Sequence, residues 1–257
     1  GKRLSISASA ELDKAWKAIA NKDWAAAAKI LTSLRATHKD NPAVWFTLGY
    51  MYGTLGNHEV AIQQYRTAIA LRPDFAMAYY NIGINYTDLK QYSNAIVAFK
   101  RSIALNPGYA RAYYNKGNAY RYLRQYAEAI ADYKKAIAID PNYAQAYYSM
   151  GLAQGRQGLY ARAVAAYRKA VAVKPDYALA YYGMGVAYDR LAAASDAYKR
   201  LGRMLDLQKA GRRVDRTAFA KYLAEYRRQT NLAVTAYGQY LRLEPRGTLA
   251  SSAKAAI

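Results

Sequence analysis

The sequence predicts an all-α protein, a right-handed superhelix of about six stacked helical hairpins in which the terminal hairpins are degenerate. Two residue types recur with one shared period. Prolines stand 34 residues apart, at Pro73, Pro107, Pro141 and Pro175. Glycines keep the same interval, at Gly49, Gly83, Gly117, Gly151 and Gly185. A common period in two independent residue types indicates a repeat architecture.

Each unit contains the pattern of two helices, as residues 110–143 illustrate. Tyr113 and Gly117 belong to a stretch of apolar and small residues at the three- and four-residue spacing of one helical face. Ala129 and Tyr133 belong to a second such stretch, which a proline ends. Glycine and alanine remove side-chain bulk where the two helices cross. We therefore expect tight antiparallel hairpins whose helices, of about 13 residues, are stable only when stacked on neighbours.

The repeat divides residues 8–247 into a single run of units. Their predicted boundaries are 8–41, 42–75, 76–109, 110–143, 144–177, 178–211 and a degenerate unit 214–247. We expect 1–7 to be a flexible segment and 248–257 to be a tail. The last quarter allows an alternative, in which 192–229 is an insertion and Tyr237 belongs to the unit that begins at residue 178.

The pattern resembles the tetratricopeptide repeat, whose signature places an aromatic residue, Leu-Gly, Tyr, Ala, a second aromatic residue, Ala and Pro at fixed offsets. The unit 42–75 has a match at each offset: Trp45, Leu48, Gly49, Tyr52, Ala61, Tyr65, Ala68 and Pro73. The next three units depart from it at Ser102 and Gln154. The resemblance implies a concave groove, lined by the first helices of successive units, in which partners bind.

The groove implied by the resemblance is expected to carry aromatic, amide and cationic side chains. The aromatic and amide residues at groove positions are Phe46, Tyr80, Asn81, Tyr114, Asn115, Asn118, Tyr148 and Tyr182, and the cations are Arg111, Arg121, Arg156 and Arg190. Tyrosine combines an apolar ring with a hydroxyl, and carboxamides can bond to a peptide backbone. Adjacent tyrosines can also serve hairpin packing alone, and we expect the first of each pair in the core: Tyr79, Tyr113, Tyr147 and Tyr181.

The charge of the chain favours an acidic partner. Lys and Arg number 38 against 17 Asp and Glu, which gives a net charge of +21. A basic patch is predicted near the end of the repeats, at Arg200, Arg203, Arg212, Arg213, Arg216, Arg227 and Arg228. This patch is interpreted as a solvated helix face, with an acidic protein, an anionic lipid surface or nucleic acid as alternatives. The family's dicarboxylate clamp is not expected, because Tyr or Phe replaces its first lysine.

The residue inventory predicts no enzyme, no cofactor and no metal site. The chain has no cysteine and two histidines, His38 and His58, which are expected to be solvated. Gly151, Gly155 and Gly158 resemble a phosphate-binding loop, but no Gly-Lys-Ser/Thr follows them.

We therefore expect a non-catalytic scaffold that holds an acidic, extended or helical segment of a partner protein in the groove. Two alternatives stay open: binding of single-stranded nucleic acid, and a structural subunit that associates with itself or with a larger assembly. The compartment is not predicted. A cysteine-free chain suits the cytoplasm and the periplasm alike, and Ala8-Ser9-Ala10 resembles a signal-cleavage pattern without the apolar stretch that should precede it.

Overall fold

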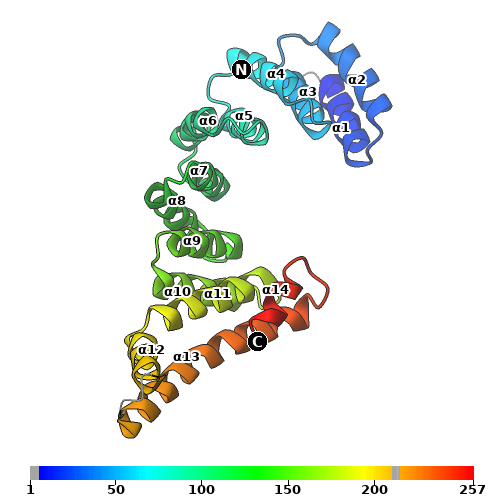
Figure 1. Cartoon of the computed structure of the whole chain (residues 1–257). Helices are drawn as coiled ribbons and strands as arrows, with labels where there is room; N and C mark the ends of the chain where they lie inside the picture. Colours follow the sequence, from blue (N-terminus) through cyan, green and yellow to red (C-terminus); the bar gives the residue numbers. More distant parts are fainter. Residues whose placement is uncertain (1–5, 210–212, 214) are drawn as a thin grey trace. The chain divides into compact units, whose positions relative to one another are not determined.

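The structure, a computed structural model, describes residues 6–209, 213 and 215–257 (Figure 1). Every regular element in these ranges is a helix, which confirms the predicted all-α fold of repeated hairpins. The chain forms two compact units, which we call unit 1 (Gly1–Gln125) and unit 2 (Tyr126–Ile257). Residues 1–5, part of the segment expected to be flexible, lie outside the described ranges.

Unit 1 consists of successive antiparallel helices. Its described elements are α1 (Ile6–Ala20), α2 (Trp24–Thr37), α3 (Pro42–Thr54), α4 (His58–Leu71), α5 (Ala76–Asp88), α6 (Tyr92–Leu105) and α7 (Ala110–Tyr122). Each of these helices packs against the next one within the unit. The odd-numbered helices from α3 onward are the first helices of their hairpins, as the 34-residue pattern predicts.

Two of the repeated glycines, Gly49 and Gly83, let an aromatic ring enter their hairpins. A Cβ added to Gly49 would lie 2.8 Å from the ring of Tyr65, and one added to Gly83 would lie 2.5 Å from the ring of Phe99. Both rings are fully buried. Because any side chain at the glycine would overlap the ring, glycine and aromatic residue must recur together, which explains their shared period in the sequence.

A left-handed residue follows the first helix of several hairpins. Gly56 and Gly158 have φ of 80° and 77°, whereas Lys22, Lys90 and Arg124 have φ of 59°, 59° and 60°. Glycine adopts this conformation without steric cost, whereas a residue with a Cβ is strained by about 1 kcal/mol or more. The turn between the two helices thus has a fixed geometry that only some repeats meet with glycine.

Unit 2 begins with the same architecture. Its described elements are α8 (Tyr126–Ile139), α9 (Ala144–Arg156), α10 (Tyr160–Val173), α11 (Ala178–Ala194), α12 (Asp196–Lys209), α13 (Arg216–Leu243) and α14 (Ala250–Ala255). Helices α9 and α10 pair in the same way as the hairpins of unit 1. A Cβ added to Gly151 on α9 would lie 2.6 Å from the ring of Tyr167 on α10.

The last hairpin pairs α11 with the C-terminal half of α13 rather than with α12. A Cβ added to Gly185 would lie 2.7 Å from the ring of Tyr237, which is the relation that Gly151 has to Tyr167. Helix α11 packs extensively on α13 and only slightly on α12. This arrangement replaces the predicted unit 178–211, and it is the one in which 192–229 is an insertion.

Helix α13 also corrects the predicted degenerate unit 214–247. The helix runs without a break over 28 residues, so these residues do not form a hairpin of their own. The predicted tail 248–257 contains α14, in which Ala250 and Ala253 are buried in the core of unit 2. Within the described residues, none of the helices combines the length and the apolar character that crossing a membrane requires.

Candidate partner-binding surface

The residues predicted for the groove lie on two surfaces, which we call the first-helix faces. In unit 1 the first helices α3, α5 and α7 contact one another in order, and in unit 2 α9 contacts α11. The predicted residues of unit 1 are Phe46, Tyr80, Asn81, Arg111, Tyr114, Asn115, Asn118 and Arg121, and those of unit 2 are Tyr148, Arg156, Tyr182 and Arg190. The fold therefore brings together the residues of each set on neighbouring helices.

Two of the predicted aromatic residues of unit 1, Phe46 and Tyr80, are half-buried and held between two other rings. The ring of Phe46 lies 5.4 Å from that of Tyr65 and stacks on that of Phe75 at 4.8 Å. Tyr80 lies 5.8 Å from the buried Phe99, and 4.8 Å from a second tyrosine, Tyr109. Such ring pairs stabilise by about 0.5–1.5 kcal/mol beyond the area they bury. The rings are thus fixed in place before any partner arrives.

Unit 2 repeats this arrangement. Tyr148 lies 5.8 Å from Tyr167 and 5.1 Å from Tyr177, measured between ring centroids. Tyr182 meets two rings of α13 edge-on, Tyr237 at 5.6 Å and Tyr240 at 5.4 Å. The first tyrosines of the four pairs, expected in the core, are also only half-buried: Tyr79, Tyr113, Tyr147 and Tyr181.

Sequence reasoning missed the aromatic residue that precedes each first helix from α5 to α11. Phe75, Tyr109 and Tyr177 each pack on the predicted groove ring of their own repeat. A signal for them exists in the sequence, because an aromatic residue stands at the final position of four successive units, from Phe75 through Tyr143 to Tyr177. Each of them stands two residues after the turn proline.

The amide side chains connect neighbouring first helices. Asn115 Nδ2 on α7 donates a hydrogen bond of 2.9 Å to the hydroxyl of Tyr80 on α5. Asn81 Nδ2 donates to the backbone oxygen of Met77, one turn earlier on its own helix. Tyr114, Asn118 and Arg121 are half-buried on α7. Asn115 therefore serves to orient Tyr80, a role that its place in the repeat did not indicate.

The hydroxyls of Tyr80 and Tyr167 stay protonated over the whole neutral range. Burial raises the pKa of Tyr80 to about 12, and the nearby guanidinium of Arg111 opposes that rise. Burial also raises the pKa of Tyr167, whose hydroxyl is influenced by Arg156 in the opposite direction. Each of these arginines thus lies close enough to a fixed tyrosine hydroxyl to affect its ionisation.

The last hairpin also places an arginine near a tyrosine hydroxyl, here Arg190 near Tyr237. Burial raises the pKa of Tyr237, and its hydroxyl donates a hydrogen bond of 2.7 Å to Oδ2 of Asp189 on α11, which raises that pKa further. Arg190, the next residue of α11, acts in the opposite direction. Arg111, Arg156 and Arg190 are all exposed. Among the described residues, the ion pairs do not include any of these three arginines.

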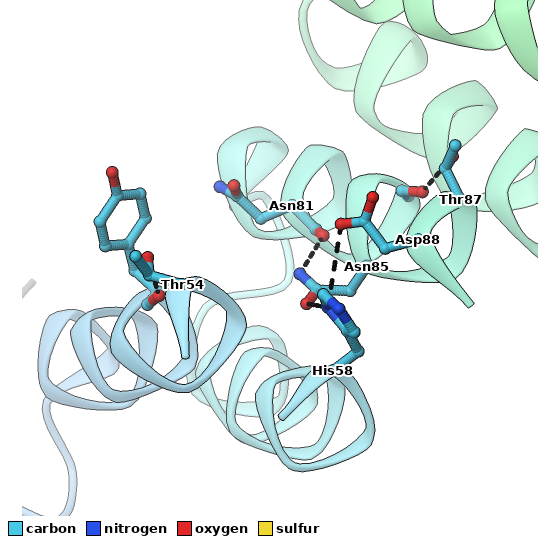
Figure 2. A network of polar contacts seen from close by, with 8 residues as sticks. Thr54, His58, Asn81, Asn85, Thr87 and Asp88 are labelled. Atoms are coloured by element: carbon cyan, nitrogen blue, oxygen red, sulfur yellow. Dashed lines mark hydrogen bonds and ion pairs between the residues drawn. The ribbon is translucent and has the colours of Figure 1, made fainter. Parts of the chain in front are cut away.

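A polar network joins α4 to α5 (Figure 2). His58 Nδ1 lies 3.0 Å from Oδ1 of the buried Asn85 and 3.8 Å from Oδ2 of Asp88. Asn85 Nδ2 in turn donates to the backbone oxygen of Asn81 at 2.8 Å. His58 is therefore a partly buried structural residue, in contrast to the solvated histidine expected from the sequence. The described residues contain no cluster of His, Cys, Asp and Glu that could hold a metal ion.

The predicted basic patch lies on α12 and on the N-terminal half of α13. Arg200 and Arg203 belong to α12, Arg216, Arg227 and Arg228 belong to α13, and Arg213 precedes that helix. All six are exposed. Arg200 Nη1 donates to the hydroxyl of Tyr222 at 2.9 Å, which fixes the guanidinium between the two helices. Arg212 lies outside the described residues.

Family models match the repeats along the middle of the chain. A model described as TPR repeat matches residues 49–86, 117–158 and 156–192, and two models described as tetratricopeptide repeat match residues 76–109 and 98–131. No protein of curated function matches the chain in sequence.

Several solved structures share the fold of this chain. A crystal structure of MamA protein is 30% identical with a TM-score of 0.60, and the match covers 66% of this chain and 93% of that one. PilW, a type IV pilus biogenesis factor, is 16% identical with a TM-score of 0.70, covering 97% and 99%. YrrB, a TPR protein with an unusual peptide-binding site, is 18% identical with a TM-score of 0.62, covering 88% and 97%. At such identities, PilW and YrrB show the fold alone.

Proposed function

Because the chain belongs to the tetratricopeptide-repeat family, we propose that it is a non-catalytic protein-interaction scaffold whose first-helix faces hold an acidic segment of a partner protein. Peptide binding on this fold has a precedent in YrrB, which carries a peptide-binding site. The partner segment binds in extended or helical form, with tyrosine rings and arginines as its contacts.

The observation that carries this proposal is the combination of exposed arginines with fixed tyrosines. Arg111, Arg156 and Arg190 are exposed, and the ion pairs of the described residues leave all three without a carboxylate. A guanidinium binds a carboxylate through two parallel hydrogen bonds, which gives both affinity and orientation. Carboxylates of a partner can therefore take positions that no carboxylate among the described residues fills.

The rings beside these arginines are organised before binding. Tyr80 is held by Tyr109 at 4.8 Å and by the hydrogen bond from Asn115, and Tyr148 is held by Tyr177 at 5.1 Å. A surface whose side chains are already ordered loses little rotamer entropy when a partner binds. The exposed part of each ring then offers apolar area next to a hydroxyl group.

Single-stranded nucleic acid is the less suitable partner for the same rings. Stacking of bases requires open aromatic faces on a cationic surface. Tyr80 packs against both Phe99 and Tyr109, and Tyr148 packs against both Tyr167 and Tyr177, so each ring already has two aromatic neighbours. The exposed edges and hydroxyl groups of these tyrosine rings are better suited to contact a peptide backbone than to stack on a nucleic-acid base.

The test compares two triple variants in binding to acidic peptides. A panel of fluorescent peptides rich in Asp and Glu is screened against the full chain, and the tightest one is titrated with Arg111→Gln/Arg156→Gln/Arg190→Gln. The control, Lys100→Gln/Lys135→Gln/Lys169→Gln, removes the same charge from exposed positions of second helices. Exposed ion pairs contribute about 0.2–1 kcal/mol each, so the loss of three should weaken binding of the arginine variant by about 3-fold to 100-fold.

Three results would contradict the proposal. One is equal weakening in both variants, which would indicate attraction by net charge alone. Another is a panel in which lysine-rich peptides bind as well as acidic ones. The third is tighter binding of a single-stranded oligonucleotide than of any peptide, with an affinity that falls steeply with salt.

A further inference from the structure

An extra helical hairpin projects from the last repeat of unit 2. Tyr237 on the C-terminal half of α13 already fills the place beside Gly185, so the repeat is complete without α12. Figure 1 shows α12 turning away from α11 and lying beside the N-terminal half of α13, with which it makes its main contacts. We call α12 and this half of α13 the inserted hairpin. Its outer surface has no role in stacking the repeats.

Helix α12 has an apolar face wider than α13 covers. Ala197 and Leu201 are buried, but Tyr198 and Leu205 on the same side remain 48% and 40% exposed. Gly202 lies one turn from each of these two residues, and a Cβ added to it would meet nothing within 4 Å. Residues at this spacing neighbour one another on a helix surface. The glycine therefore leaves a gap between two uncovered apolar side chains.

This gap is part of a hollow of about 680 Å³ between α12 and α13. The ring of Tyr226 on α13 forms its other wall, with its centroid 5.6 Å from that of Tyr198. Lys199 and Arg203 line the hollow together with one carboxylate, Asp206. The hollow thus has apolar walls, a glycine where a side chain would otherwise stand, and a cationic border.

We propose that this hollow is a docking site for an acidic amphipathic helix of a partner protein. An apolar side chain of that helix enters above Gly202, between Tyr198 and Leu205, as a knob enters a hole in packed helices. Its carboxylates pair with Lys199 and Arg203. The site is separate from the first-helix faces and does not depend on what they bind.

Shape and charge select this occupant over the other candidates. A concave hollow receives a single projecting side chain, whereas a lipid surface binds apolar side chains that project from a helix. A second copy of this chain is disfavoured because each copy has a net charge of +21. An acidic helix matches both the hollow and its cationic border.

The probes are three stapled fluorescent helices of equal length. All three carry the same leucine stripe, and their other faces carry glutamate, glutamine or lysine. Fluorescence anisotropy with the full chain measures their affinities, and vesicles of phosphatidylcholine with phosphatidylserine test the lipid alternative by co-sedimentation. The glutamate helix should bind at least tenfold more tightly than the lysine helix.

Gly202→Leu fills the gap, and Gly238→Leu is its matched control. Gly238 also lies in a helix, and a Cβ added to it would likewise meet nothing within 4 Å. Both substitutions replace a helix-weakening glycine and should leave the melting temperature equal or higher. Gly202→Leu should weaken binding of the glutamate helix at least tenfold, whereas Gly238→Leu should change it less than twofold.

Charge reversal provides an independent variant. Lys199→Glu/Arg203→Glu should exchange the preference, so that the lysine helix binds more tightly than the glutamate helix. The proposal is overturned if the glutamate helix does not bind the wild-type chain, or if both leucine variants bind it alike. Vesicle binding that Gly202→Leu does not change would assign the patch to a lipid surface instead.

Discussion

Replacing Gly185 with alanine tests whether α13 completes the last hairpin. The added Cβ would lie 2.7, 2.8 and 2.9 Å from three ring atoms of Tyr237, whereas carbon atoms in contact stay about 3.5–4.0 Å apart. The ring or its helix must therefore retreat by close to 1 Å in a packed core, which costs about 1–3 kcal/mol. Alanine also favours the helix by about 1 kcal/mol over glycine, which offsets part of this loss.

The control for this prediction is Gly202→Ala in the inserted hairpin. It gains the same helix propensity, but its added Cβ meets no atom within 4 Å. Urea unfolding, followed by far-ultraviolet circular dichroism, should therefore place Gly185→Ala about 1–3 kcal/mol below Gly202→Ala. Adding Tyr237→Leu should relieve the overlap, so the double variant should lose less than the two single losses combined. Strict additivity would refute the assignment of Tyr237 to this hairpin.

Three further predictions concern unit 1. His58→Ala should cost about 1–2 kcal/mol in urea unfolding, because Oδ1 of the buried Asn85 loses its hydrogen-bond partner. Adding Asn85→Ala should recover most of this loss, and a double variant less stable than the single one would contradict the network. Raising the pH should lower the free energy of unfolding between about 10 and about 12, because the folded chain keeps the Tyr80 proton that the unfolded chain releases near pH 10. Tyr80→Phe should make this decline less steep, while Tyr167 and Tyr237, whose pKa values are also raised, keep contributing to it. An unchanged slope would exclude Tyr80 as a contributor. Lys90→Gly should raise stability by up to about 1 kcal/mol in thermal melts by relieving a φ of 59°, whereas Lys100→Gly within α6 should lower it; a loss in both would contradict the strain at Lys90.

The 34-residue period was enough to predict the fold, because each of these hairpins needs the same pair of residues: a glycine on its first helix and an aromatic ring on its second helix. Gly83 and Phe99 stand 16 residues apart, as do Gly49 and Tyr65, and both pairs meet in the structure. The same relation links Gly185 to Tyr237 over a much longer interval. An insertion lengthens the interval between the glycine and its aromatic partner in the sequence without changing their contact in the fold. A pattern with a fixed 34-residue period could therefore offer the pairing of Gly185 with Tyr237 only as an alternative.

The candidate surface was less predictable than the fold, since the degree of burial depends on residues outside the repeat signature. The place of Tyr80 on a first helix was foreseen, but its packing on Tyr109 and its bond to Asn115 were not. His58 shows the same limit, because its partner Asn85 occupies a position at which the next three 34-residue repeats have alanine. Contacts specific to one repeat leave no trace in a pattern shared by all of them.

The most direct test of the first-helix faces as binding surfaces is site-directed photo-crosslinking. The chain contains no cysteine, so a single introduced cysteine can carry a benzophenone at a chosen place. Gln145→Cys puts it on the first-helix face of unit 2, and Lys169→Cys puts it on a second helix of the same unit, both at exposed positions. The selected acidic peptide should cross-link at residue 145 and not at residue 169. Cross-linking at residue 169 alone, or equally at both, would contradict the proposed binding surface.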